Sequence, residues 1–204
     1  GMYAVYHGKN GIQFISDTVH RNATTLAVAL TDLGFEQVNS HYFDTIQIKA
    51  ETAVLRPVAE SHEVNFLYID DNTVSISLNE TVGLKELNAI VNIFTSAFNI
   101  AEKEITAFVD ADVIPDLAKR NTSFLDHEVF NSYQSETEMM RYIKRLERKD
   151  LALNHSMISL GSCTMKLNAA SEMLPLSLAN WGNIHPFVPL NQAEGYHIVL
   201  NKLE

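Results

Sequence analysis

The sequence predicts a mixed α+β fold in which a small sheet with two helices comes first and a mainly helical or irregular arm follows. Two segments have apolar residues at the helical period, and they enclose three short segments that are apolar or that alternate apolar with polar residues. Residues 124–204 contain no convincing strand pattern. Two helices and about three strands form a two-layer domain around one core.

The first predicted helix covers residues 11–33. Asn10 stands at its N-cap position, with Gln13 at the capping-box offset, and Gly34 supplies a C-terminal stop. The apolar residues that recur close to the helical period are Ile12, Ile15, Val19, Leu26, Leu30 and Leu33.

A strand and a short helix are predicted next. In residues 45–50, Ile46 and Ile48 alternate with polar residues, which is the pattern of a strand with one buried face. Residues 53–61 suit a short helix, in which Pro57 is tolerated only within the first turn because it lacks an N–H group.

A hairpin and a second long helix complete this part. Residues 64–69 and 73–78 are joined through Asp70-Asp71-Asn72, which favours a tight turn between two antiparallel strands. Residues 84–98 have the stripe of an amphipathic helix. We therefore expect a small α+β domain over residues 1–108.

The pattern weakens over residues 109–123, which we expect to form a connector. In residues 124–204, the predicted arm, Ser135 and Glu138 are spaced as a capping box at the start of a helix. Short helical pieces are expected near residues 168–174 and 192–203. The apolar stripe of the capped helix consists of Met139, Ile143 and Leu146. We expect this stripe to pack on the first domain or on a second copy of the chain.

Composition excludes several functions. The net charge of −10 argues against nucleic acid as a partner, because phosphate binding needs clustered Lys and Arg. The single cysteine, Cys163, excludes an internal disulfide and a zinc site made of cysteines, and no metal site is expected. No apolar run reaches the roughly 18–20 residues that cross a membrane, so no membrane partner is expected.

The richest motif is Leu160-Gly161-Ser162-Cys163-Thr164-Met165-Lys166-Leu167-Asn168, followed by Asn183-Ile184-His185-Pro186-Phe187-Val188-Pro189-Leu190. Small polar groups beside one lysine can present hydroxyls, N–H groups and a positive charge to an anion. From the residues alone, a surface turn explains Ser162 and Thr164 equally well, and Lys166 suits an exposed helix start. His185 is stiffened by Pro186, and it suits either proton transfer or stacking on a cofactor, or a structural hydrogen bond.

Several segments together resemble the glycine decarboxylase family, the P-protein of the glycine cleavage system. In the second half of the chain the resemblance rests on the motif above and on Val129-Phe130-Asn131-Ser132-Tyr133, Leu153-Asn154-His155-Ser156-Met157 and Gln192-Ala193-Glu194-Gly195-Tyr196. In the first half it rests on Met2-Tyr3-Ala4-Val5-Tyr6-His7-Gly8, Phe43-Asp44-Thr45 and Ile76-Ser77-Leu78-Asn79-Glu80-Thr81-Val82.

The resemblance implies an internal fragment that spans the junction between the two homologous halves of the enzyme. Residues 1–108 would be the small C-terminal domain of a fold-type-I pyridoxal-phosphate (PLP) half, and residues 124–204 would lead into the absent PLP-binding domain. The parent would decarboxylate glycine with PLP and transfer the aminomethyl group to the lipoyl arm of H-protein. It would be a homo-oligomer, cytoplasmic in bacteria or in the mitochondrial matrix in eukaryotes.

The resemblance also sets the expected site. The cofactor lysine of the family follows a histidine and precedes a glycine-rich stretch, and this sequence contains neither element. No catalytic residue is therefore expected in the chain, no PLP is expected to stay bound to it, and it should be inactive alone. The candidates to line the parent active site and bind its cofactor or substrate are Ser162, Thr164, Lys166 and His185.

Two other functions are compatible with the residues. One is a non-catalytic assembly or interaction module whose arm packs on a partner subunit. The other is a complete small enzyme that uses Cys163 with His155 or His185, although nothing in the sequence places a base beside that thiol.

Overall fold

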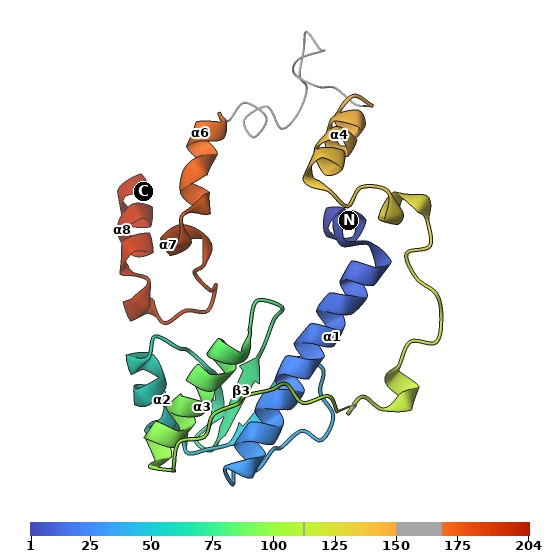
Figure 1. The fold of residues 1–204 in the computed structure, drawn as a ribbon. Coiled ribbons are helices and arrows are strands. Elements are labelled where there is room, and N and C mark those ends of the chain that lie inside the picture. The colour runs from blue at the N-terminus through green and yellow to red at the C-terminus, as the bar shows by residue number, and fades with distance from the viewer. Residues whose placement is uncertain (112, 150–168) are drawn as a thin grey trace. The chain divides into compact units, whose positions relative to one another are not determined.

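The computed structural model describes residues 1–111, 113–149 and 169–204. The chain divides into two compact units, residues 1–139 and residues 140–204. Figure 1 shows the course of the chain, and each unit is described by itself. The first unit contains a three-stranded antiparallel sheet with helices, so the mixed α+β character predicted from the sequence is confirmed.

The sheet has the strand order β1-β3-β2, with β1 at Thr45–Lys49, β2 at Leu67–Asp70 and β3 at Thr73–Ser77. Ile46 lies opposite Ile76, and Ile48 lies opposite Val74. The predicted hairpin is confirmed, but β2 begins three residues later than expected. The N–H group of Val64 bonds instead to the carbonyl of Ala59, 2.9 Å away, at the end of the preceding helix.

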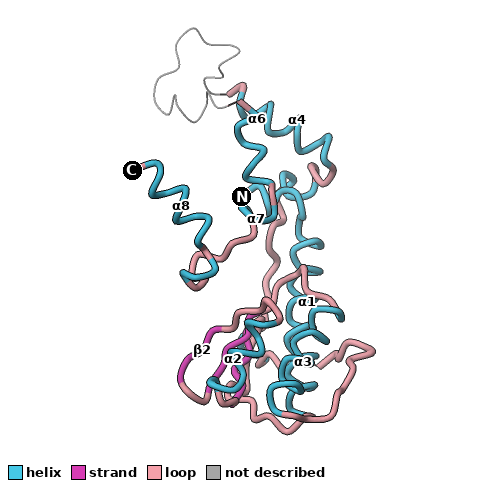
Figure 2. Tube along the Cα trace, turned by 90° about the vertical axis from the view of Figure 1, so that its left-hand side faces the viewer, coloured by secondary structure: helices cyan, strands magenta, loops and turns pink. Residues whose placement is uncertain are grey.

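Helices α1 (Met2–Asp32) and α3 (Leu84–Phe98) lie side by side against one face of the sheet (Figures 1 and 2). Helix α2 (Thr52–Ser61) packs beside α3. Together they enclose one core, because the apolar stripes of α1 and α3 meet the inward side chains of β1 and β3. Its largest fully buried apolar side chains are Phe94, Leu26, Leu30, Ile46, Ile48, Leu55, Leu87, Ile93, Val74 and Val91.

The N-terminal boundary predicted for the first helix was wrong. Helix α1 begins at Met2 and passes through Asn10, which therefore caps nothing. The helix is interrupted instead at Gly8, whose φ of 63° and ψ of −175° belong to a region that only glycine occupies readily. The C-terminal stop was predicted correctly, since the helix ends before Gly34, where φ is 95°.

The restriction placed on Pro57 was also wrong. This proline lies in the middle of α2 and not in its first turn. A proline there cannot donate to the carbonyl of Ala53, one helical turn earlier. Ala53 and Pro57 both lie on the exposed face of the helix, so water can satisfy this carbonyl. The short helix therefore tolerates the interruption.

After α3 the chain is tied back to the core. The side-chain amide of Asn88 accepts from the N–H of Ile105 at 2.7 Å and donates to the carbonyl of the same residue at 3.0 Å. Further on, the N–H of Val109 donates to Thr25 Oγ1 of α1 at 2.9 Å. These bonds direct residues 109–111 and 113–124 along α1, with a short 3₁₀ helix, η1, at Asp116–Ala118.

Residues that follow this connector contact the N-terminal part of α1. Gly8 lies so close to the 3₁₀ helix η2 (Glu128–Asn131) that an added Cβ would be 2.6 Å from the carbonyl oxygen of Phe130. Helix α4 (Glu136–Glu147) then begins as predicted, with the N–H of Glu138 donating to Ser135 Oγ at 3.3 Å. The first compact unit accordingly extends to Met139.

The described end of the chain, residues 169–204, is built from short helices and turns, as the sequence predicted. Its elements are α6 (Ala170–Met173), η3 (Leu174–Ser177), α7 (Ala179–Gly182), η4 (Leu190–Gln192) and α8 (Glu194–Leu203). Ala193 is buried in this stretch, whereas most of its large apolar side chains are exposed.

We predict that residues 1–108 fold alone and that residues 122–204 do not. The buried core cluster lies between Ala23 and Ile105, so the first polypeptide keeps it complete. The second would have to offset an ordering entropy of roughly 1–2 kcal/mol per residue with little burial. Thermal denaturation followed by circular dichroism should show a cooperative transition for residues 1–108 alone. A cooperative transition of monomeric residues 122–204 would contradict the prediction.

We also predict that Gly8→Ala lowers the free energy of unfolding by about 2 kcal/mol or more, because the backbone conformation is strained and the new Cβ meets η2. Gly34→Ala is the matched control, since Gly34 also has positive φ but has open space around it. Gly34→Ala should lower the free energy of unfolding by about 1 kcal/mol or less. Urea denaturation of both variants measures the difference, and equal losses would show that the approach to η2 contributes nothing.

Candidate functional site

Three of the four candidate site residues lie outside the described residues. Ser162, Thr164 and Lys166 belong to residues 150–168, as do His155 and Cys163. Their placement therefore stays a prediction. His185 is the candidate that the structure describes, and it lies in the second compact unit between α7 and η4.

His185 organises a tight turn. Its backbone carbonyl accepts from the N–H of Val188 at 3.0 Å, and its Nδ1 accepts from the N–H of Phe187 at 3.1 Å. An Nδ1 that accepts a hydrogen bond carries no proton, so the neutral ring carries its proton on Nε2. The side chain is exposed, and the Nε2–H group can donate to a group outside the turn. The geometry therefore suits a positioning donor for an anion.

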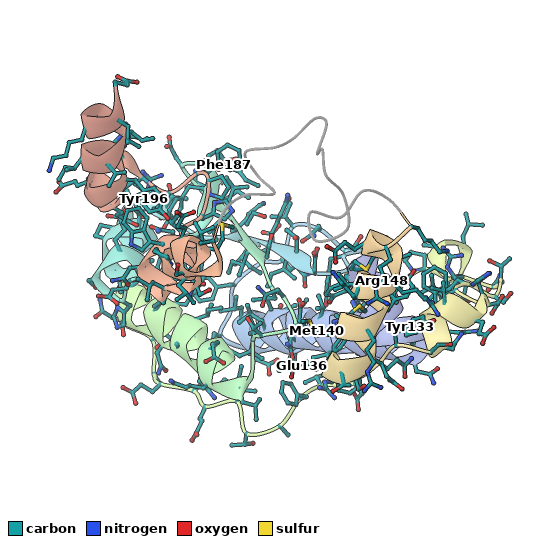
Figure 3. The ribbon with its side chains drawn as sticks, turned by 90° about the horizontal axis from the view of Figure 1, so that it is seen from above. Tyr133, Glu136, Met140, Arg148, Phe187 and Tyr196 are labelled. Carbon is teal, nitrogen blue, oxygen red and sulfur yellow. The ribbon has the colours of Figure 1, made fainter. Side chains whose placement is uncertain are left out.

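The turn is held between two short helices that are tied to each other. The ring of Trp181 on α7 lies 5.0 Å, centroid to centroid, from the ring of Tyr196 on α8, and the Tyr196 hydroxyl donates to the Trp181 carbonyl. Trp181 itself is 38% exposed. Phe187, which is labelled in Figure 3, is more exposed, with 89% of its surface accessible.

The residues around this turn present an unusually apolar surface. Large apolar side chains that elsewhere form cores are exposed along most of the segment, which is typical of a surface that packs on another part of a protein. They include Leu174, Leu176, Leu178, Phe187, Leu190, Ile198, Leu200 and Leu203. The described part of this unit is therefore better suited to cover a site than to form one unaided.

The rest of the described chain offers little independent chemistry. Within those residues, no group of three His, Cys, Asp or Glu side chains is placed to hold a metal ion. Tyr3 donates to Glu80 Oε1 at 3.2 Å, and partial desolvation together with this carboxylate raises the pKa of the tyrosine. A phenol with a raised pKa stays protonated and does not serve as a base near neutral pH. No helix in the described ranges has the length and hydropathy needed to cross a membrane.

Comparison with known proteins finds one matching family and several longer relatives that share one name. The family described as glycine cleavage system P-protein matches residues 1–94. A glycine dehydrogenase (decarboxylating) from Christiangramia forsetii is 58% identical over 204 residues, which cover all of this chain and 22% of that protein. The proteins of the same name from Flavobacterium johnsoniae and Bacteroides fragilis are 55% and 46% identical, again over the whole chain and 22% of their length. The chain thus spans about a fifth of these relatives.

We predict that the His185 side chain protects the Phe187 amide. His185→Ala removes the acceptor of a hydrogen bond that contributes about 0.5–1.5 kcal/mol. Hydrogen exchange at the Phe187 N–H should then be roughly 2–12 times faster. His185→Asn is the control, since its side-chain oxygen can accept from the same N–H two residues on and should keep the slower rate. Equal exchange in all three proteins would remove the structural role assigned to the ring.

Proposed function

Because the chain belongs to the glycine cleavage system P-protein family, we propose that it is a segment of a PLP-dependent glycine decarboxylase. The observation that carries the proposal is identity of 58% along the entire chain to a protein of which the chain covers only 22%. The full-length protein would decarboxylate glycine and pass the aminomethyl group to the lipoyl arm of H-protein. The segment alone would be inactive.

Residues 1–108 would be the small C-terminal domain of the first fold-type-I half of that enzyme. A sheet covered by helices on one face, with its own core, supports this assignment. Residues 124–204 would be the arm that leads into the second half. The exposed apolar side chains of residues 169–204 support it, because large exposed apolar patches typically mark surfaces that pack on another body.

The residues of this chain would act by binding and orienting. PLP, when bound, draws electrons away from the bond that breaks as the glycine carboxylate leaves. The lysine that holds the cofactor would lie outside these residues, since the sequence contains no His-Lys pair. Lys166 would place a positive charge near the glycine carboxylate or the cofactor phosphate, with Ser162 and Thr164 as hydroxyl donors. His185 would add its Nε2–H group from the turn described above.

The remaining assignments follow from the family. We propose that the full-length protein binds lipoylated H-protein and glycine, forms a homo-oligomer and works in the cytoplasm, as its relatives come from bacteria. The second candidate function is a non-catalytic assembly module. The exposed apolar surface of residues 169–204 favours it independently, since that surface suits packing on a partner whether or not a reaction follows.

The test is Lys166→Met in the full-length protein, which removes the charge and keeps most of the aliphatic stem. Charge-assisted hydrogen bonds to an anion contribute roughly 1.5–3 kcal/mol, so glycine turnover should fall by about one to two powers of ten. Thr164→Val should lower turnover by a smaller factor, because it removes one neutral donor. Steady-state kinetics with glycine and with PLP as the varied ligands measure both effects.

Lys202→Met is the matched control, since Lys202 is an exposed lysine of α8 and should leave turnover unchanged. If Lys166→Met and Thr164→Val both leave the kinetics unchanged, the motif is structural. If the full-length wild-type protein decarboxylates no glycine, the assembly module is favoured instead.

A further inference from the structure

A groove of about 1560 Å³ runs along α1, on the side where the connector passes. Its walls are the stretch of α1 from Lys9 to Arg21, residues 41–43, residues 109–111 and residues within 114–124, all within the first compact unit. Small-molecule sites typically enclose roughly 300–1,000 Å³, so the groove is larger than one of them needs. Lys9 and Arg21 are about 18 Å apart along the helix axis. These dimensions suit an extended stretch of polypeptide.

The charge in the groove is opposite to that of the chain. The whole chain carries a net charge of −10, yet among the described residues four cationic side chains line the groove against two acidic ones. One of the four cations, Lys119, forms an ion pair with Asp116 at 2.8 Å. Within the described residues, no carboxylate pairs with Arg21 or Arg120, and Lys9 has only a 3.7 Å contact with Asp126. The cations are Lys9, Arg21, Lys119 and Arg120, and the acids are Asp17 and Asp110.

Aromatic rings hold three of these cations in place. The Arg21 guanidinium lies 4.4 Å from the centre of the Phe108 ring. At the other end, Lys9 Nζ and the Arg120 guanidinium each lie 5.5 Å from the centre of the Phe124 ring. A cation on a ring face is oriented without being neutralised. Two like charges brought to one ring repel each other, and an anion bound between them would relieve that repulsion.

The groove wall near Arg21 also contains polar atoms that have no hydrogen-bond partner among the described residues. Arg21 Nε and His20 Nε2 are buried without a hydrogen-bond partner in the described structure, although His20 Nδ1 lies 2.9 Å from the Phe43 carbonyl. Buried polar atoms in native proteins almost always have partners. These two unsatisfied atoms are groups that an occupant of the groove could supply with partners.

We propose that the groove binds an extended acidic segment with two carboxylates about 18 Å apart, one at Arg21 and one at Lys9 and Arg120. At roughly 3.3 Å per residue, this distance corresponds to five or six positions in an extended chain. We assign the segment to the same protein, outside these 204 residues. The relatives are more than four times as long, and tethering gives such a segment a high effective concentration. The assignment of the segment to the same protein rests on the proposed function, whereas the proposal that the groove binds an acidic segment does not.

The experiment measures fluorescence anisotropy of a labelled peptide that has two glutamates separated by five Ser and Gly residues. It should bind the 204-residue chain at least tenfold more tightly than a peptide of equal composition with adjacent glutamates. Arg21→Met and Arg120→Met should each weaken binding at least tenfold. Arg56→Met is the matched control, because Arg56 also lies on an aromatic ring, 4.3 Å from the centre of Tyr68, but outside the groove.

A charge-reversal variant distinguishes the loss of a binding contact from misfolding, because only a folded variant can gain affinity for a different peptide. Arg21→Glu should lose the two-glutamate peptide and should bind, at least tenfold more tightly than wild type does, a peptide in which one glutamate is replaced by lysine. Equal affinity for the spaced and adjacent peptides, or insensitivity to both Arg21 and Arg120, would overturn the proposal.

The full-length protein tests the source of the segment. In the full-length protein, that protein's own acidic segment should occupy the groove. The full-length protein should therefore bind the labelled peptide at least tenfold more weakly than the 204-residue chain does. Equally tight binding would overturn the assignment to the same protein. Glycine turnover is measured separately, and a full-length protein that lacks it would refute the proposed function without changing the peptide result.

Discussion

Ile46, Ile48, Val74 and Ile76 lie on the same face of the sheet, and the arrangement of the first compact unit depends on keeping that face covered. A shift of one residue in the pairing of β1 with β3 would turn Gln47 and Lys49 into the core, so the register is strongly specified. On the outer face β1 and β3 present polar side chains, and Thr45 and Ser77 share a 2.8 Å hydrogen bond there. Helices α1 and α3 must therefore lie together on the inner face.

A second constraint follows from the polar atoms at the edge of this core. Asn88 is part of α3, and its amide holds both backbone groups of Ile105. Without these bonds the part-buried Asn88 Oδ1 and the N–H and carbonyl groups of Ile105 would lose these partners, which is costly away from water. The chain after α3 is thus fixed against the domain before it reaches α1. The groove lies where the connector, guided to this position, passes α1, and its lining includes Lys9, Arg21 and Arg120.

The sequence was sufficient to predict those helices and strands whose apolar residues repeat with the period of the element. These are the strands of the hairpin and the two long helices. Local signals were less reliable. Asn10 has the chemistry of a cap, but the backbone freedom of Gly8 shifts the break in the helix. Pro57 was misjudged because its tolerance depends on whether the Ala53 carbonyl faces water, which only the three-dimensional structure shows.

The candidate site was inferred in a different way, and it stays a prediction. Composition and spacing left Ser162, Thr164, Lys166 and His185 with equally good structural explanations, and the family resemblance alone separated them from ordinary turn residues. For His185 the structure adds a definite tautomer, which no sequence pattern specifies. The groove was missed because Lys9 and Arg21 are far in sequence from Phe124 and Phe108, and their convergence depends on the path of the connector.

The exposed apolar side chains of residues 169–204 have a consequence for handling the protein. At neutral pH the net charge of −10 keeps copies of the chain apart in solution. That repulsion vanishes near the isoelectric point of about 5.2, where surfaces carrying Leu174, Phe187 and Leu203 can adhere. Mildly acidic buffers and high salt, which remove or screen the charge, are therefore the conditions in which this chain precipitates first.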